Sequence, residues 1–393
     1  MSSRQSSISR SRRPQSTNAT SVGSRSGRSS AYGKDFQQHL ADYNVHMNNR
    51  RSKALNATEM QSELAHERAS LSPSQFSEGD FEEFCRKNED SAFESEVITS
   101  VLPILSGNSS IHNKQNVLFT ELEPITNSGA VKPKPDFFDG ARLGDLNQNI
   151  RNDKGILSAA IPTKHSNVPV VPNFFLEVKG PDGNASVAQR QACYDGAHGT
   201  RAIHALQNYK ETEPIYDGNA YTYSSTYHAG TGTLQLYAHH VTAPATVNER
   251  PKYHITQIDG WQMTGNINSF RRGATAFRNA RDSAQRHRNH FIQAANAKAT
   301  QAMPSVQENL NDSAPHDSRE DPAYTTLQDA DDALQQQLAF EDEDEDEDES
   351  ISYGNEGSSN SGQGSPTLKA PMQKRSRLST SPQSCSRHSK RNH

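Results

Sequence analysis

The sequence is poor in apolar residues and in cysteine. Only 32% of its 393 residues are hydrophobic, and it holds a single tryptophan. No stretch approaches the roughly 20 apolar residues that a membrane-spanning helix needs, and the first 30 residues contain no apolar block typical of a signal peptide. The three cysteines, Cys85, Cys193 and Cys385, are too widely spaced for a disulfide framework or a CxxC zinc site. We therefore expect an intracellular protein that is neither secreted nor bound to a membrane.

The aromatic residues indicate where the folded part of the chain lies. Of the 27 Phe, Tyr and Trp residues, 21 fall between Phe76 and Phe291. We predict one domain over residues 76–299. Residues 1–75 are predicted to be a disordered basic arm rich in Ser and Arg, and residues 300–393 a disordered tail, because neither composition can bury enough apolar surface to fold.

Charge is strongly segregated, although the net charge is only −5. The run Glu341–Glu349 consists of nine consecutive carboxylates. It is interpreted either as a solvating tail or as a segment that binds a histone or another basic partner, or folds back on the domain. Lys374–Arg377 is typical of a nuclear-localisation patch, and phosphorylation at the adjacent Ser381-Pro382 would weaken it. We expect a nuclear or cytoplasmic protein.

The hydrophobic patterns predict an α/β (α+β) domain. Apolar positions recur at helical spacing over Phe76–Gly107, Ser186–Gln207 and Asn268–Ala297. Strands are predicted over Asn116–Ile125, Pro135–Phe138, Asn173–Val178, Ala220–Tyr227, Thr233–His240 and Tyr253–Gln262. Gly230-Thr-Gly232 joins two of these strands as a hairpin, and residues 141–171 form an irregular insertion with a short helix around Asp145–Arg151. This order indicates a mixed central sheet flanked by helices.

Two segments carry the residues best suited to chemistry, Lys132–Gly140 (KPKPDFFDG) and Asn173–Gly180 (NFFLEVKG). Glu177 and Lys179 are two positions apart on a predicted strand, so their side chains point to the same face. If the strand with Asp136 lies beside this one, a second carboxylate joins them. Two carboxylates suit Mg²⁺, which keeps several waters and leaves coordination positions for phosphate.

The pattern Pro135-Asp136 followed by Glu177-x-Lys179 resembles the PD-(D/E)XK nuclease-like superfamily. The wider frame is similar to an uncharacterised fungal family placed within it, and includes PNFFLEVKGPDG, RQACYDGAHG, YDGNAYTYSSTYH, WQMTG and FRRGATAFRNARD. The resemblance covers residues 76–299 and implies a restriction-endonuclease-like core of helix, three strands, helix and strand. Asp136 and Glu177 are 41 positions apart, so the insertion between them must loop out if the two strands are to pair.

The resemblance implies hydrolysis of a phosphodiester in DNA or RNA. Asp136 and Glu177 would hold Mg²⁺ or Mn²⁺, which polarises the phosphate and lowers the pKa of bound water. Lys179 would orient or deprotonate that water and offset charge in the transition state. The alternative is that Glu177 and Lys179 form an exposed cross-strand ion pair, worth at most about 1 kcal/mol.

Further residues are candidates by the same resemblance. Some members carry a Gln and a Tyr on the helix after the third strand, usually spaced Q-x-x-x-Y. Gln191 is the catalytic candidate here, although Tyr194 is only three positions away. Glu94 or Glu96 on the leading helix would supply a third carboxylate, but exposed helices carry Glu routinely.

Other polar residues favour structural interpretations. Asp139 and Asp195 each precede a glycine, which is typical of turn residues. Three histidines near the predicted hairpin, His228, His239 and His240, have no cysteine partner and no HExxH pattern, which disfavours a zinc site.

Two features favour contact with nucleic acid. The last predicted helix carries six arginines, and with its Phe heptad toward the core its outer side would be a basic stripe; the arginines are Arg271, Arg272, Arg278, Arg281, Arg286 and Arg288. Tyr221, Tyr223 and Tyr227 lie at alternate positions of one predicted strand and so share a face. They either stack on bases or form one packed face of the sheet.

The sequence supports two functions. The first is a Mg²⁺-dependent nuclease, which requires Asp136, Glu177 and Lys179 to meet. The second is a catalytically silent nuclease-fold adaptor that binds nucleic acid or chromatin through its charged tails, since a fold by itself does not establish an activity.

Overall fold

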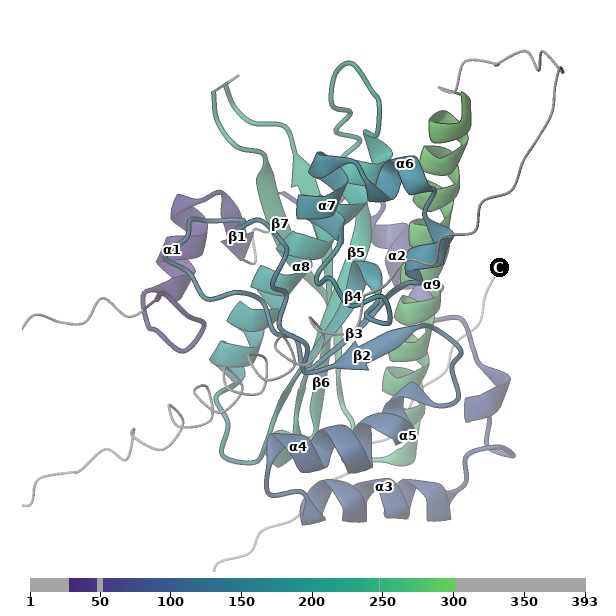
Figure 1. The fold of residues 1–393 in the computed structure, drawn as a ribbon. Helices are drawn as coiled ribbons and strands as arrows, with labels where there is room; N and C mark the ends of the chain where they lie inside the picture. The colour runs from purple at the N-terminus through teal and green to yellow at the C-terminus, as the bar shows by residue number, and fades with distance from the viewer. Residues whose placement is uncertain (1–27, 48–51, 247, 302–393) are drawn as a thin grey trace, which may run out of the picture. The chain divides into compact units, whose positions relative to one another are not determined.

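A mixed seven-stranded sheet forms the centre of the molecule (Figure 1). Its strands are β1 (Val45–Met47), β2 (Asn113–Gln115), β3 (Phe137–Ala141), β4 (Val170–Lys179), β5 (Ala220–His228), β6 (Thr233–Thr242) and β7 (Lys252–Gln262). Their order is β1-β7-β6-β5-β4-β3-β2, with β1–β7 and β4–β5 parallel and the other neighbours antiparallel. The structure is a computed structural model that describes residues 28–47, 52–246 and 248–301.

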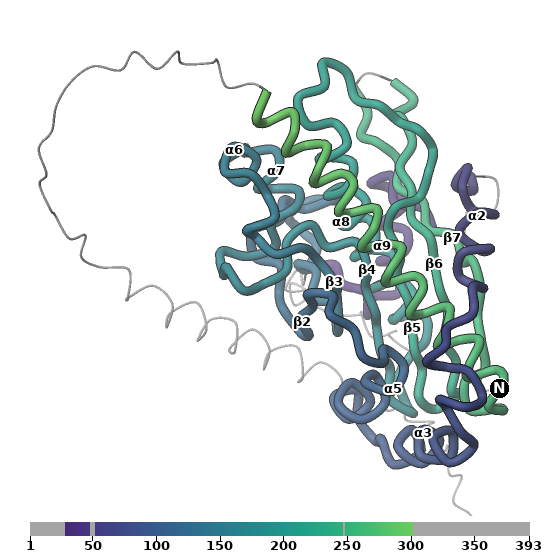
Figure 2. The backbone as a smooth tube through the Cα atoms, turned by 90° about the vertical axis from the view of Figure 1, so that its right-hand side faces the viewer, coloured from purple at the N-terminus to yellow at the C-terminus, as the bar shows by residue number. Residues whose placement is uncertain are grey.

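Two long helices cover opposite faces of the sheet. The helices are α1 (Phe36–Asp42), α2 (Ala57–Leu64), α3 (Glu78–Asp90), α4 (Glu94–Glu96), α5 (Leu102–Ser106), α6 (Gln148–Arg151), α7 (Lys154–Ala160), α8 (Ala185–Gln207) and α9 (Ile267–Gln301). Gly199 of α8 lies against Phe175, whereas α9 packs in one apolar cluster with Phe174 and Leu176. Because alternate side chains of a strand point to opposite faces and both faces are covered, β4 is buried along its whole length. Figure 2 shows α9 running across the strands of the sheet.

The predicted mixed sheet with flanking helices is confirmed. The last four strands and both long helices lie where the patterns place them, and Ala229–Thr231 with Gly232 in the left-handed conformation forms the expected hairpin turn. The N-cap of α8 is Asn184, whose side chain accepts a hydrogen bond from the Ser186 N–H.

Two local predictions were wrong. The leading helix is broken near Phe93 into α3 and an α4–α5 segment, the middle of which, Val97–Val101, is a π-helix. Residues 116–125 contain no strand; Phe119 and Leu122 instead pack from a loop onto Phe138 and Phe175. Apolar residues in that stretch reflect burial rather than strand pairing.

The N-terminal region between residues 28 and 75 is folded, which corrects the prediction of a disordered arm there. Phe36 and Leu40 are one helical turn apart in α1 and fully buried, and β1 pairs with β7 as the edge strand of the sheet. Met60 and Leu64 anchor α2 in the same way. The apolar residues are few, but their spacing places them on one face. Residues 1–27 and 302–393, with the acidic run and Lys374–Arg377, lie outside the described residues.

The insertion at residues 141–171 does loop out, so that β3 and β4 pair as antiparallel strands. The short helix expected within it is confirmed as α6, and α7 is a second helix that was not predicted. Ile150 and Ile156 pack against the C-terminal halves of α8 and α9. Within the described part of the chain, no helix is long and apolar enough to cross a membrane.

Candidate active site

Asp136, Glu177 and Lys179 lie together at one end of the β3–β4 pair. Phe137 is paired with Leu176, and extending this register by one residue places Asp136 opposite Glu177. An Asp136 carboxylate oxygen accepts a hydrogen bond from the Val178 N–H at 2.7 Å, between the other two residues. The three side chains predicted to meet therefore do so, on the face of the sheet covered by α8.

The two carboxyl groups are removed from water. Asp136 is 9% exposed and Glu177 is fully buried. Burial raises the pKa of Asp136, and the positive charge of Lys179 only partly opposes this. Burial raises the pKa of Glu177 well above its ordinary value, and the neighbouring carboxyls of Asp136 and Asp195 raise it further. The site thus holds more negative groups than it can keep ionised without a cation.

Asp195 is a third buried carboxyl group of this site, and it was missed from the sequence. It lies in the middle of α8 rather than in a turn, is 3% exposed and lies close enough to Glu177 for each carboxyl to shift the pKa of the other. Burial raises the pKa of Asp195 to about 7; the neighbouring Glu177 opposes the shift, and Asp136 adds to it. The signal was the spacing Gln191-x-x-x-Asp195, since residues four apart share a helix face.

Lys179 is the positive charge of the site. Its Nζ donates to Glu94 Oε1 at 2.7 Å and lies 5.8 Å from the centre of the Tyr32 ring. Burial alone lowers the pKa of Lys179, but attraction to Asp136 and Glu94 outweighs it and raises that pKa above its ordinary value. Of the two predicted helix carboxylates, Glu94 reaches the site. Glu96 instead accepts from the N–H groups of Ala92 and Phe93 and caps its own helix.

The residues present fit a divalent cation in their chemistry. Both carboxylate oxygens of the buried Glu177, and Oε1 of Gln191, receive no hydrogen bond from a donor within the described ranges. Such orphaned oxygens are costly unless a cation or water satisfies them. No group of three or more His, Cys, Asp or Glu side chains in the described part of the chain is already arranged around a metal-sized point. Asp136 and Glu177 are therefore the two ligands to test.

Tyr194 has a structural role. Its hydroxyl donates to the Val131 carbonyl, and its ring packs edge-on against Phe36 and His198. It is 4% exposed, so it belongs to the core between α1 and α8. Gln191, three positions before it, is only half-buried.

Asp139 is not a turn residue either. It lies in β3 on the face covered by α9, where its two oxygens accept from Nε and Nη2 of Arg281, both at 2.8 Å. Both side chains are buried, and the Arg281 guanidinium lies over the Phe137 ring. This bidentate ion pair fastens the last helix to the sheet.

The predicted basic stripe on the last helix is wrong, because most of its arginines contact the protein itself. Arg278 donates to the carbonyls of Ile104 and Leu105, and Arg288 contacts Asn173. Arg272 and Arg286 are exposed, and Arg286 pairs with Glu63.

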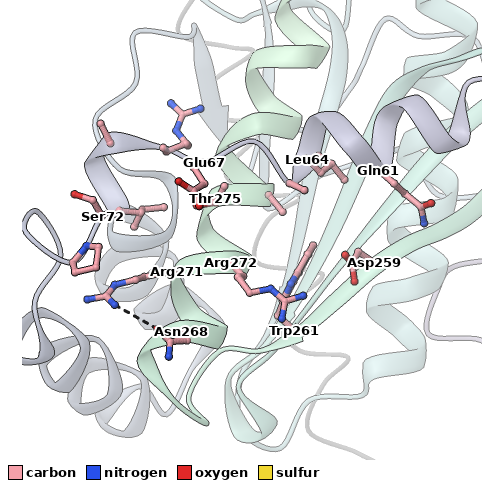
Figure 3. A pocket seen from close by; sticks show the side chains of 16 residues that line it. Gln61, Leu64, Glu67, Ser72, Asp259, Trp261, Asn268, Arg271, Arg272 and Thr275 are labelled. Atoms are coloured by element: carbon pink, nitrogen blue, oxygen red, sulfur yellow. Dashed lines mark hydrogen bonds between the residues drawn. The ribbon is translucent and has the colours of Figure 1, made fainter. Parts of the chain in front are cut away.

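A cleft of about 560 Å³ lies between the α2 region and the start of α9 (Figure 3). Trp261, Asp259, Arg271 and Arg272 line it, and Asn268 accepts a hydrogen bond from Arg271 at 3.5 Å. None of the carboxyl groups of the candidate site lines this cleft.

The predicted base-stacking tyrosines are mostly core residues. Tyr223 and Tyr227 are buried, and their hydroxyls donate to Ser283 and Asn88. Tyr221 is half-buried and donates to Asp217. The period-two pattern therefore marks one packed face. Among the hairpin histidines, His239 hydrogen-bonds to Ser224.

Comparison of the chain with family models, with curated proteins and with solved structures gives no match. The argument for function therefore depends on the site itself.

Proposed function

We propose that the protein is a metal-dependent nuclease with a restriction-endonuclease-like core, which hydrolyses phosphodiester bonds in DNA or RNA. The observation that supports it is the meeting of Asp136, Glu177 and Lys179 on neighbouring strands, with the oxygens of Glu177 unpaired. Two acids and an amine in a dry site suit the stabilisation of charge on a phosphate.

Each residue has a distinct role in this proposal. Asp136 and Glu177 would hold Mg²⁺ or Mn²⁺, which would supply Lewis acidity toward the scissile phosphate and a water of lowered pKa. Lys179 is held by Glu94, and it would donate a hydrogen bond to the phosphate or to the attacking water. Gln191, whose Oε1 has no donor among the described residues, would accept a hydrogen bond from that water.

The alternative is a silent site on an adaptor that binds nucleic acid or chromatin. It is favoured by the closure of the site, since Glu177 is 0% exposed and Lys179 is 2% exposed and already paired. The nuclear location from Lys374–Arg377, and a histone or other basic partner for Glu341–Glu349, depend on the sequence alone and stay predictions.

The decisive experiment is cleavage by the full chain and by Lys179→Met, which keeps the length of the side chain without its charge. We expect the wild type to nick plasmid or degrade single strands with Mg²⁺ or Mn²⁺, and to stop when a chelator is added. Lys179→Met should lower the rate by about 100-fold or more, because one electrostatic contact to the transition state is lost.

The matched control is Lys164→Ala, since Lys164 is a mostly exposed lysine whose nearest acid, Glu121, is 4.0 Å away. It should cleave at the wild-type rate. Both variants should keep the far-UV circular dichroism of the wild type. Binding of nucleic acid with no metal-dependent cleavage by the wild type would instead support the adaptor.

A further inference from the structure

Exposed aromatic side chains are rare in this protein, and they lie beside the candidate site. Within the described ranges, five large apolar side chains are exposed: Tyr32, Leu55, Phe93, Leu157 and Ile215. Tyr32 and Phe93 are the aromatic members of that set, at 46% and 68% exposure. Each ring exposes apolar area that a ligand could cover.

Both residues adjoin Lys179 or its partner Glu94. The Tyr32 ring centre is 5.8 Å from the Lys179 ammonium. Phe93 directly precedes Glu94, the residue that accepts from Lys179 at 2.7 Å. The backbone at Phe93 also packs on Gly180, next to Lys179, with the Phe93 carbonyl carbon 3.6 Å from the position of a Cβ added there.

The segment with Tyr32 is held in place from both sides. Ser29 exchanges backbone hydrogen bonds with Gly129 and Val131, at 2.7 and 2.9 Å. Arg190 of α8 donates from Nε to the Ala31 carbonyl at 2.5 Å. Tyr32 therefore lies in a turn that these hydrogen bonds hold beside the site. Six arginines and no acid precede it in the sequence.

The geometry points to single-stranded nucleic acid as the ligand of this rim, with its bases stacked on Tyr32 and Phe93. Every base has a flat face for an aromatic ring, and such stacking does not depend on sequence. A duplex keeps its bases paired inside and presents only its backbone, whereas an unpaired strand can turn its bases outward to the rings. Its phosphate would then face the narrow entrance at Lys179.

This inference takes the class of polymer from the proposed function, but it is tested through binding rather than cleavage. The full chain is titrated in chelator against four fluorescent ligands of equal length. These are an oligothymidylate, an oligouridylate, a DNA duplex, and an abasic strand that keeps every phosphate.

Tyr32→Ala and Phe93→Ala should each weaken binding of both base-bearing single strands by about tenfold, because stacking on one base contributes roughly 1–3 kcal/mol. Binding of the duplex and of the abasic strand should change less than about twofold. Tyr32→Phe and Phe93→Tyr keep the rings and should bind like the wild type. Leu55→Ala and Leu157→Ala, which truncate the exposed aliphatic residues, are the surface controls.

Equal weakening for all four ligands would overturn the inference, because it would indicate a loss of charge or of fold. The same holds if both alanine variants bind single strands like the wild type, or if the wild type binds no single strand. A stronger effect on the oligouridylate or on the oligothymidylate would show whether RNA or DNA fits the rim better. Normal stacking in a protein that never cleaves would leave this inference standing and refute the nuclease.

Discussion

The strand β3 carries two buried aspartates, three positions apart, that face opposite sides of the sheet. Asp139 faces α9 and both of its oxygens are bound by the guanidinium of Arg281. Asp136 faces α8 and shares its surroundings with Glu177, Asp195 and the single ammonium of Lys179.

The difference between these two buried sites is one of charge compensation. On the α9 side each charge has a hydrogen-bonded partner, which is the arrangement that a structural ion pair requires. On the α8 side three carboxyl groups meet, the oxygens of Glu177 lack donors, and the pKa of Asp195 is raised to about 7. Stability does not explain such an arrangement, and we therefore assign function to the α8 side and structure to the α9 side.

The largest expected effect follows from breaking the compensated pair. Arg281→Met leaves Asp139 buried without a partner and should lower the free energy of unfolding by about 3–5 kcal/mol, measured in urea. The double variant Asp139→Leu with Arg281→Met should recover most of this loss, because no charge then remains unpaired. If the single variant is as stable as the wild type, the α9 pair does not have the structural role assigned to it.

Removal of a charge from the α8 side should instead raise the free energy of unfolding. The folded-state pKa of Asp195 is raised from 3.8 to about 7, so the folded protein binds this proton more tightly than the unfolded chain does. Stability is therefore lost as the pH rises from about 4 to 7. Asp195→Asn, which mimics the protonated acid, should stabilise the metal-free protein at pH 8 by on the order of 2 kcal/mol.

That gain should shrink as the pH is lowered toward 4, where the wild-type carboxyl is protonated as well. It is measured by urea unfolding in chelator at pH 5 and pH 8. Asp282→Asn is a suitable control, since that acid is 39% exposed and pairs with Arg68. A variant that is less stable than the wild type at both pH values would contradict the contrast between the two faces.

The smallest effect is expected at a third set of buried titratable groups. His46, His254 and His240 stack in register across β1, β7 and β6, with ring centres 5.5 and 4.8 Å apart. Burial lowers the pKa of His254 and of His240 to about 4, and Lys252 and the other imidazoles lower that of His254 further. The charged groups on these strands that act on His254 are His240, His46 and Lys252, and all of them are basic.

Since these folded-state pKa values lie below the unfolded value of 6.5, the row contributes stability above pH 6.5 that is lost as the pH falls to about 4. After allowance for solvent screening the loss is about 1 kcal/mol for each imidazole. His254→Gln should reduce the loss of stability between pH 7 and pH 4.5. Thermal unfolding at the two pH values measures this loss. An unchanged acid limb would show that the pKa of His254 is the same in the folded and the unfolded chain.

Much of the fold could be predicted because its signals are local. Strands β4 to β7 are runs of β-branched and aromatic residues bounded by turn residues, and α9 repeats Phe270 and Phe277 at heptad spacing. The same local rule places Glu177 and Lys179 on one face of a strand. The folded segment before Phe76 was not predicted, because its few apolar residues gain burial only by packing on the distant strand β7 and on α8 and α9.

Residues whose role depends on a distant partner were the ones misjudged. Asp195 precedes a glycine and was taken for a turn residue, but the helix continues through it and directs it toward Glu177. The arginines of α9 were assigned to an outer stripe, yet Arg281 finds its acid 142 positions earlier in the chain. Tyr32 reaches Lys179 only because its segment pairs with the loop at Ala130.

By itself the amino-acid order determined the alternation of side chains along each strand, the periodicity of each helix, and hence which residues share a face. These follow from backbone geometry within a few residues. Only the tertiary structure decided which charges are compensated and which aromatic rings remain in water. Both depend on the order of strands in the sheet and on which helix covers which face, and these bring together residues that no local spacing relates.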